Sequence, residues 1–261
     1  MPIGPSRMPF LKHLDELRKR LFVLFGVLSV AVIALYFFTD PIYRFILAPV
    51  WPILKGGKPI AIGVLDPMTV KFGLSLWSSL VVCSPLIVWE LMAFLLPALK
   101  PKERKWVIPT FLAMVVLFAA GVALCYTVIL PASFEWLAGQ AGAIMMFTPT
   151  AGDMLAVVEF FLLGFGVAFQ VPIIVFYLVF FGVVPYRKLR DNWRFIYVGI
   201  TIAAAMITPD WSPVSMGALA IAMVILYEGA MLACRVVLAR RIKAQNAPDV
   251  EDDDDDDEAA S

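Results

Sequence analysis

The sequence predicts an all-α integral membrane protein in which six transmembrane helices form a bent, concave bundle. Hydrophobic residues make up 61% of its 261 residues and charged residues 16%, against about 45–50% and about 25% in soluble domains. The apolar residues fall in long blocks, and the cations gather in alternate segments between those blocks. The composition and the blocks indicate helices that cross lipid, and the cations indicate which side each connection occupies.

Six apolar blocks approach the roughly 20 residues that a helix needs to cross a bilayer. The first block is too long for the apolar core of a removable signal peptide, and no small-x-small cleavage pattern follows it, so we expect a retained span. We expect the six spans at Leu21–Thr39, Phe72–Leu96, Trp106–Leu130, Met154–Phe181, Trp193–Thr208 and Val214–Cys234.

Lysine and arginine predict the orientation, because they are enriched in the cytoplasmic connections of membrane proteins. The N-terminal segment, residues 98–105, residues 182–194 and the C-terminal end together hold 17 of the 21 cations. The 131–153 loop and the 209–213 turn hold none. These segments alternate along the chain, which predicts that both termini are in the cytoplasm, with the spans in a bacterial plasma (inner) membrane.

Two cytoplasmic segments flank the expected membrane domain at residues 21–234. Residues 1–20 are amphipathic, and Phe10–Leu21 is predicted to lie as a helix on the membrane surface. Residues 235–261 include the run DVEDDDDDDE, whose nine acids repel one another and predict a disordered, solvated tail.

Prolines and unequal span lengths predict bends. The fourth span would be about 42 Å long as a straight helix, so it must tilt or kink, and Pro172 offers the kink. Pro85 and Pro109 are expected to add further bends. The last two spans should form a short, tight pair, and the apolar ILAPVWPIL stretch of the 40–71 loop should rest at the outer interface as a cap.

Three glutamates and one glutamine lie within the apolar blocks. Glu159 and Gln170 are three helical turns apart on one face with Gly166 between them, which predicts a polar stripe toward a cavity or a partner helix. The alternative is that a protonated Glu159 only hydrogen-bonds a neighbouring helix. Glu90 and Glu228 lie nearer the cytoplasmic ends of their spans. Two interpretations stay open for them: a functional role, or side chains that only extend to water.

The sequence contains no pattern typical of an enzyme. It has no GxxxxGK[ST] phosphate loop and no serine-nucleophile motif, and its single histidine, His13, cannot build a zinc or haem site. The three cysteines fall in apolar blocks and are expected to be inert thiols. We therefore expect no catalytic residues, no metal and no cofactor.

Several short motifs occur in the order found in one known family. From Phe10 to about Arg241 the chain resembles TatC, the multispanning receptor of the twin-arginine protein translocase. The matching pieces are HLDELRKRL against HLxELRxRL, FLLPALKPKERK against FxxPALxxxER, the residues Phe118, Gly121, Tyr126 and Pro131, GFGVAFQVP against FGxxFExP, and ITPD followed by LYEGAMLACR.

The resemblance implies a receptor for folded proteins that carry a signal with two adjacent arginines. The family's signal-binding carboxylates match Glu16 and Glu103, and Arg18 and Arg104 lie in the same motifs and are assigned to the same site. A carboxylate can accept a guanidinium bidentately, and the surrounding cations should exclude other basic peptides. The implied partners are twin-arginine signal peptides, TatA/TatB-type single-span subunits, further copies of the chain and the lipid bilayer, with no nucleic acid; the implied energy source is the proton gradient.

Without the family resemblance, the sequence also allows simpler, structural roles for Glu16 and Glu103. Glu16 could be only an i,i+4 partner of Lys12 or Arg20 on a surface helix. Glu103 could be a solvated charge within KPKERK.

One position departs from the family, and two other function classes stay open. Gln170 stands where many members have glutamate, and an amide cannot exchange a proton, so Glu159 is the candidate for any proton role. An ion-coupled transporter or channel for a small solute could use Glu159 and Glu90 as its relay, although no inverted repeat is visible in the sequence. A structural membrane scaffold without a substrate is the third class.

Overall fold

The computed structural model describes residues 10–54, 59–95, 104, 107–142, 147–208 and 212–237, and the side chains of these residues except 10–14 and 95. Helices dominate this part of the chain, and its only β-type pairing is an isolated bridge between Ile60 and Thr150. The elements are α1 (Phe10–Tyr36), α2 (Thr39–Leu47), the 3₁₀ turn η1 (Trp51–Leu54), α3 (Asp66–Val82), α4 (Ser84–Leu95), α5 (Val107–Leu124), the π-helical turn η4 (Cys125–Ile129), α6 (Leu130–Ala141), α7 (Ala151–Ala168), α8 (Val171–Phe180), α9 (Tyr186–Asp191), α10 (Trp193–Ile207) and α11 (Pro213–Val237).

All six expected spans coincide with apolar helices among the described residues. Four continuous or nearly continuous helical stretches are long enough to cross a membrane: Asp15–Tyr36, Val107–Ala141, Ala151–Phe180 and Pro213–Val237. The second span is the pair α3 and α4, and the fifth is the 15-residue α10. At about 1.5 Å per residue, α10 is shorter than the roughly 30 Å hydrocarbon layer.

Of the three prolines expected to bend a span, Pro85 lies at a bend and Pro172 at a break in the helix. The helices α3 and α4 meet at 53° next to Pro85, and α7 gives way to α8 two residues before Pro172. Proline removes a backbone N–H and clashes with the preceding turn, so each helix restarts at its proline. Pro109 produces no bend, because it lies in the first turn of α5, where no helical hydrogen bond is lost.

The third span continues beyond its expected end at Leu130. Residues 131–153 were expected to form a loop, but the helix runs on as α6 to Ala141. The π-helical turn η4 explains the continuation: the N–H of Leu130 donates to the oxygen of Cys125, five residues back, so Pro131 can follow without ending the helix.

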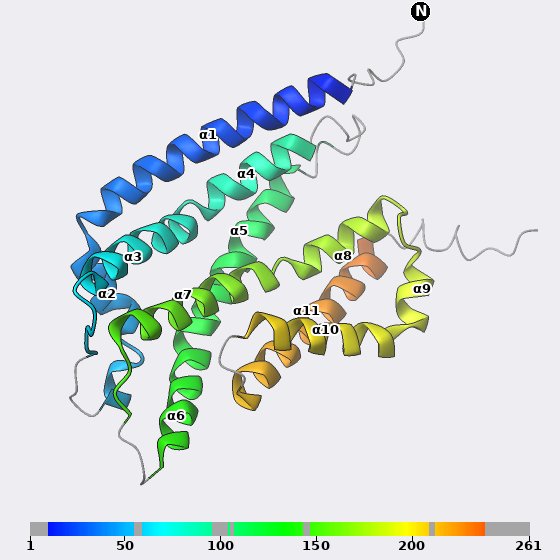
Figure 1. Cartoon of the computed structure of the whole chain (residues 1–261). Helices are drawn as coiled ribbons and strands as arrows, with labels where there is room; N and C mark the ends of the chain where they lie inside the picture. The colour runs from blue at the N-terminus through cyan, green and yellow to red at the C-terminus, as the bar shows by residue number, and fades with distance from the viewer. Residues whose placement is uncertain are drawn as a thin grey trace, which may run out of the picture.

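The N-terminal helix is also longer than expected. The predicted surface helix Phe10–Leu21 is confirmed as helical, but it is not a separate element, because α1 is one unbroken helix through Tyr36. Figure 1 shows α1 alongside α3 and α4, at the edge of the bundle. The sequence from Phe10 to Leu21 contains no proline or glycine that would separate the amphipathic turns from the apolar ones.

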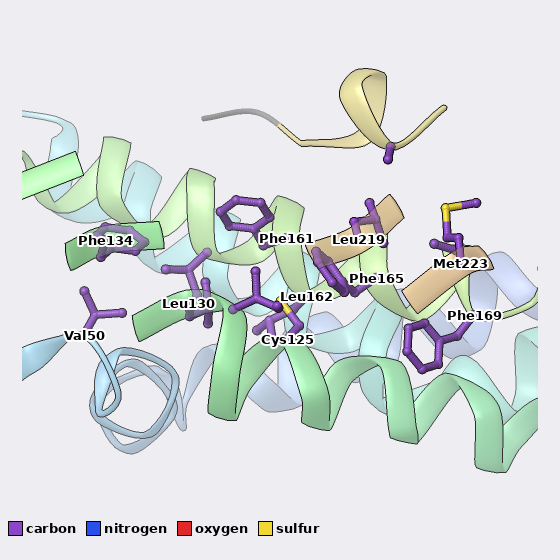
Figure 2. Packing of buried hydrophobic residues seen from close by; sticks show 14 of the residues in the cluster. Val50, Cys125, Leu130, Phe134, Phe161, Leu162, Phe165, Phe169, Leu219 and Met223 are labelled. Carbon is purple, nitrogen blue, oxygen red and sulfur yellow. The ribbon is translucent and has the colours of Figure 1, made fainter. Parts of the chain in front are cut away.

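The largest core cluster is built around α7. Figure 2 shows Phe161, Leu162 and Phe165 of α7 packed among residues of η4, α6 and α11. The expected outer cap belongs to this core, because Leu47 and Val50 of the ILAPVWPIL stretch have no exposed surface. By contrast, no residue in the apolar window of the first span is buried, so most of the surface of α1 faces away from the other described helices.

Candidate functional site

A cluster of three charged side chains joins α1 to α4 in the N-terminal half of α1. Arg20 donates to Glu16 Oε1 from Nη2 at 2.7 Å and from Nε at 3.2 Å. The same guanidinium donates from Nη1 to Glu90 Oε2 at 2.9 Å. Two carboxylates of different helices therefore hold one guanidinium between them.

Helix geometry accounts for both halves of this cluster. Glu16 and Arg20 are four residues apart, so they lie on the same face of α1, as the plainer reading of Glu16 expected. Glu90 comes from α4, which begins after the break at Cys83 and lies against α1. The sequence reading placed Glu90 near an end of its span but did not pair it with Arg20.

The cluster is electrostatically unbalanced and only partly buried. Two carboxylates face one guanidinium, which leaves one negative charge in excess. The side chains of Arg20, Glu16 and Glu90 are 26%, 25% and 17% exposed, so water and solutes reach them. Among described residues, nothing donates a hydrogen bond to Glu16 Oε2 or Glu90 Oε1.

The other two described residues assigned to the signal-binding site, Arg18 and Arg104, form no ion pair with this cluster. Arg18 is exposed and lies over the Phe22 ring, with its guanidinium carbon 5.5 Å from the ring centre. Arg104 is exposed. Glu103 lies outside the described residues, so the pairing of Glu16 with Glu103 remains a prediction.

A largely apolar groove of about 600 Å³ opens between α2, α3, α5 and α7. Glu159 of α7 lines this groove, is only 5% exposed, and its Oε1 finds no hydrogen-bond partner in the described part of the chain. The hydroxyl of Ser78, on α3, is likewise buried in the groove wall without a described partner. Both residues line the groove, and each has a buried oxygen without a hydrogen-bond partner among the described residues.

Gln170 is on the same side of α7–α8 as Glu159 but is engaged differently. Its Nε2 donates to the Met114 oxygen of α5 at 3.1 Å, at the break between α7 and α8. Gly166 lies between the two polar residues, and a Cβ there would come within 2.6 Å of the Phe118 ring. Both polar residues therefore face α5, but only Glu159 lines the groove.

Glu228 does not simply reach water. Its two oxygens accept from Arg190 Nη1 at 3.1 and 2.8 Å, and Oε1 also accepts from the Tyr197 hydroxyl at 2.5 Å. These contacts join α9, α10 and α11. Glu228 therefore has a structural role, because its contacts hold three helices together.

The reading of the sequence missed the two arginines that hold the intramembrane carboxylates. Arg20 was considered only as a partner of Glu16 and Arg190 only as a cytoplasmic cation, yet each lies close to the end of a span, as Glu90 and Glu228 do. In each pair the arginine and the glutamate lie at the predicted cytoplasmic ends of their segments, and this shared position could have predicted the pairing from the sequence. Across the described residues, no three His, Cys, Asp or Glu side chains lie close enough to hold a metal ion.

Comparisons with known proteins agree with this architecture. The sequence model of the family described as Sec-independent protein translocase protein (TatC) matches residues 12–221. The chain is 32% identical to the TatC of Deinococcus radiodurans over 92% of this chain and 91% of that one. It is 32% identical to the TatC of Escherichia coli K12, over 84% of this chain and 85% of that one.

A solved structure shows the same fold. The crystal structure described as the twin arginine translocase receptor TatC superimposes with a TM-score of 0.73 at 24% identity, over 86% of this chain and 98% of that chain. The family and the fold make the chain a multi-pass membrane component of a protein translocase rather than an enzyme. The chain belongs to the TatC family of Sec-independent protein translocase proteins.

Proposed function

We propose that this chain is the receptor core of a twin-arginine-type translocase and that it binds twin-arginine signal peptides at its cytoplasmic face. Glu16 and Glu103 are the carboxylates that would take the two guanidinium groups. Folded cargo would then be exported at the expense of the proton gradient. Both termini would be cytoplasmic, as the distribution of lysine and arginine predicts.

The observation that supports this proposal most directly is the contact between Glu16 and a guanidinium. Two nitrogens of Arg20 approach one Glu16 oxygen, at 2.7 and 3.2 Å. The Glu16 carboxylate is thus oriented and accessible enough to accept an arginine. The excess negative charge of the cluster favours a further cation over an anion.

The groove lined by Glu159 is the proposed contact for a partner's transmembrane helix. In lipid, an unpaired carboxyl is costly, and a helix that brings a side-chain hydrogen-bond donor would satisfy it. Glu159 and Ser78 line this groove of about 600 Å³, and each has a buried oxygen, without a partner among the described residues, that such a donor would satisfy. TatA/TatB-type single-span subunits are the proposed occupants, and further copies of the chain would complete the complex.

An export assay with a twin-arginine reporter tests the proposal. Glu16→Ala and Glu103→Ala should each abolish export while the protein is still inserted at wild-type amounts. Glu135→Ala is the matched control, because Glu135 is an exposed carboxylate on α6, in the segment assigned to the outer side. Unimpaired export by both test variants would exclude the receptor assignment.

The solute-transporter alternative finds less support. Its relay required Glu159 and Glu90 to act together, but Glu90 is paired with Arg20, whereas Glu159 lines a groove that does not include Glu90. Loss of solute uptake in Glu159→Gln, with export intact, would favour the transporter instead.

A further inference from the structure

We infer that Arg20 occupies the arginine-binding site as an internal stand-in for a signal arginine, and that Glu90 is a further carboxylate of that site. This inference rests on the proposed function, because it assumes that Glu16 takes an arginine of the signal peptide. A signal arginine then binds by displacing Arg20 from both carboxylates.

The bonds made by Arg20 are the bonds that an incoming arginine would make. One edge of its guanidinium, Nε and Nη2, faces Glu16, and its remaining nitrogen, Nη1, faces Glu90 at 2.9 Å. The planar fork of a guanidinium suits carboxylates placed in this way, whatever chain the arginine belongs to. Glu90 therefore recognises the same chemical group as Glu16.

Charge and exposure allow the exchange. The cluster keeps one negative charge in excess, and Glu16 Oε2 and Glu90 Oε1 accept no hydrogen bond from described residues. A second guanidinium can bind these oxygens before Arg20 leaves. The exchange thus avoids two uncompensated carboxylates at a partly buried position, which would be costly.

No other described cation competes for the two carboxylates. Arg18 is directed onto the Phe22 ring, and Lys19 is exposed and forms no ion pair with a described residue. Arg20 is also the polar link from α1 to α4, and the apolar window of α1 has no buried residues. Displacement of Arg20 therefore removes this link between the two helices.

The internal arginine also sets specificity. A ligand must replace three hydrogen bonds made by a rigid fork. A lysine ammonium is a point charge with a strong hydration shell and matches these positions less well than a guanidinium does. Competition from Arg20 thus favours arginine over lysine in the signal.

Binding of fluorescent synthetic signal peptides to the full-length chain in detergent tests the inference. One peptide carries two arginines, and its partner carries two lysines at the same positions. Arg20→Gln should bind the twin-arginine peptide about tenfold more tightly, and the twin-lysine peptide should gain even more. Glu90→Gln should weaken twin-arginine binding about tenfold, whereas Glu135→Gln should bind as the wild type does.

Arg20→Lys keeps the test decisive if Arg20→Gln does not fold. It retains the charge but not the fork, so it too should raise the affinity for the twin-arginine peptide. Weaker twin-arginine binding by a folded Arg20 variant would overturn the inference. Unchanged binding by Glu90→Gln, with binding lost in Glu16→Gln, would overturn it while leaving the proposed function intact. A wild-type chain that binds neither peptide would overturn both.

Discussion

Gly121 of α5 lies directly against the backbone of Phe165 in α7. A Cβ at Gly121 would come within 2.7 Å of the Phe165 oxygen and 2.8 Å of Phe169 Cγ. Helices in lipid associate by close packing through small residues, because lipid supplies no hydrophobic force between them. This contact holds α5 against the buried helix α7, and the groove lined by Glu159 opens beside it.

Gly121→Val should destabilise the protein, because a backbone oxygen at 2.7 Å cannot move aside as a flexible side chain can. Overpacking of this kind costs about 1–3 kcal/mol. The measurement is thermal unfolding of the purified chain in detergent. Gly73→Ala is the control, because a Cβ at Gly73 in α3 meets nothing within 4 Å. A Gly121→Val chain as stable as the wild type would contradict this account of the α5–α7 contact.

Assembly with single-span partner subunits should depend on whether the side chain at position 159 can accept a hydrogen bond. Glu159→Leu removes the acceptor in the groove and should reduce co-purification of single-span partner subunits. Glu159→Gln keeps an acceptor oxygen, so most of the co-purification of partner subunits should be retained. Val157→Leu provides a control elsewhere on α7, as Val157 does not line the groove. Equal co-purification with Glu159→Leu and the wild type would exclude the groove as a partner site.

Glu228→Gln should lower the unfolding temperature by a few degrees and leave binding of a twin-arginine peptide unchanged. The substitution breaks the ion pair with Arg190, which is partly solvated, and weakens the bond from Tyr197, so the loss should be modest. Asp191→Asn is the control, because its pair with Arg187 is longer, at 3.5 Å, and more exposed. Loss of peptide binding in Glu228→Gln would instead make Glu228 part of the signal-binding site.

The orientation of the chain can be tested by labelling with a membrane-impermeant maleimide in intact cells. Glu135→Cys on α6 should be labelled, and Lys188→Cys on α9 should be labelled only after the membrane is permeabilised. Both positions are exposed. The parent chain supplies the background, because Cys125 and Cys234 are buried and the partly exposed Cys83 is present in every variant. The reverse pattern of labelling would place Glu16 on the wrong side to meet cargo before export.

The spans and their breaks were predictable because they depend on local composition. The length of an apolar block and the missing N–H of a proline affect only nearby residues, so the six helices, the bend near Pro85 and the break near Pro172 were expected. The end of the third span at Leu130 was predicted wrongly, because the π-helical turn that lets α6 continue has no clear sequence signature.

The candidate site was predictable only in part, because its contacts join distant segments. Arg20 and Glu90 are 70 residues apart in the chain, and their pairing depends on how α4 leaves the break at Cys83. Glu159 was expected to face a cavity or a partner helix, but the groove that it lines depends on the packing of four helices. The resemblance to a family pointed to Glu16, and helical spacing offered Arg20 as its partner, but the bond from Arg20 to Glu90 was visible only in the structure.

Photocrosslinking of a twin-arginine signal peptide to the full-length chain tests the central claim most directly. A photoreactive residue at position 104, next to Glu103, should form an adduct with the peptide, and Glu16→Ala should abolish that adduct. A twin-lysine peptide should give little product. An adduct of equal yield with the twin-lysine peptide, or one that survives loss of Glu16, would contradict recognition of paired guanidinium groups at this site.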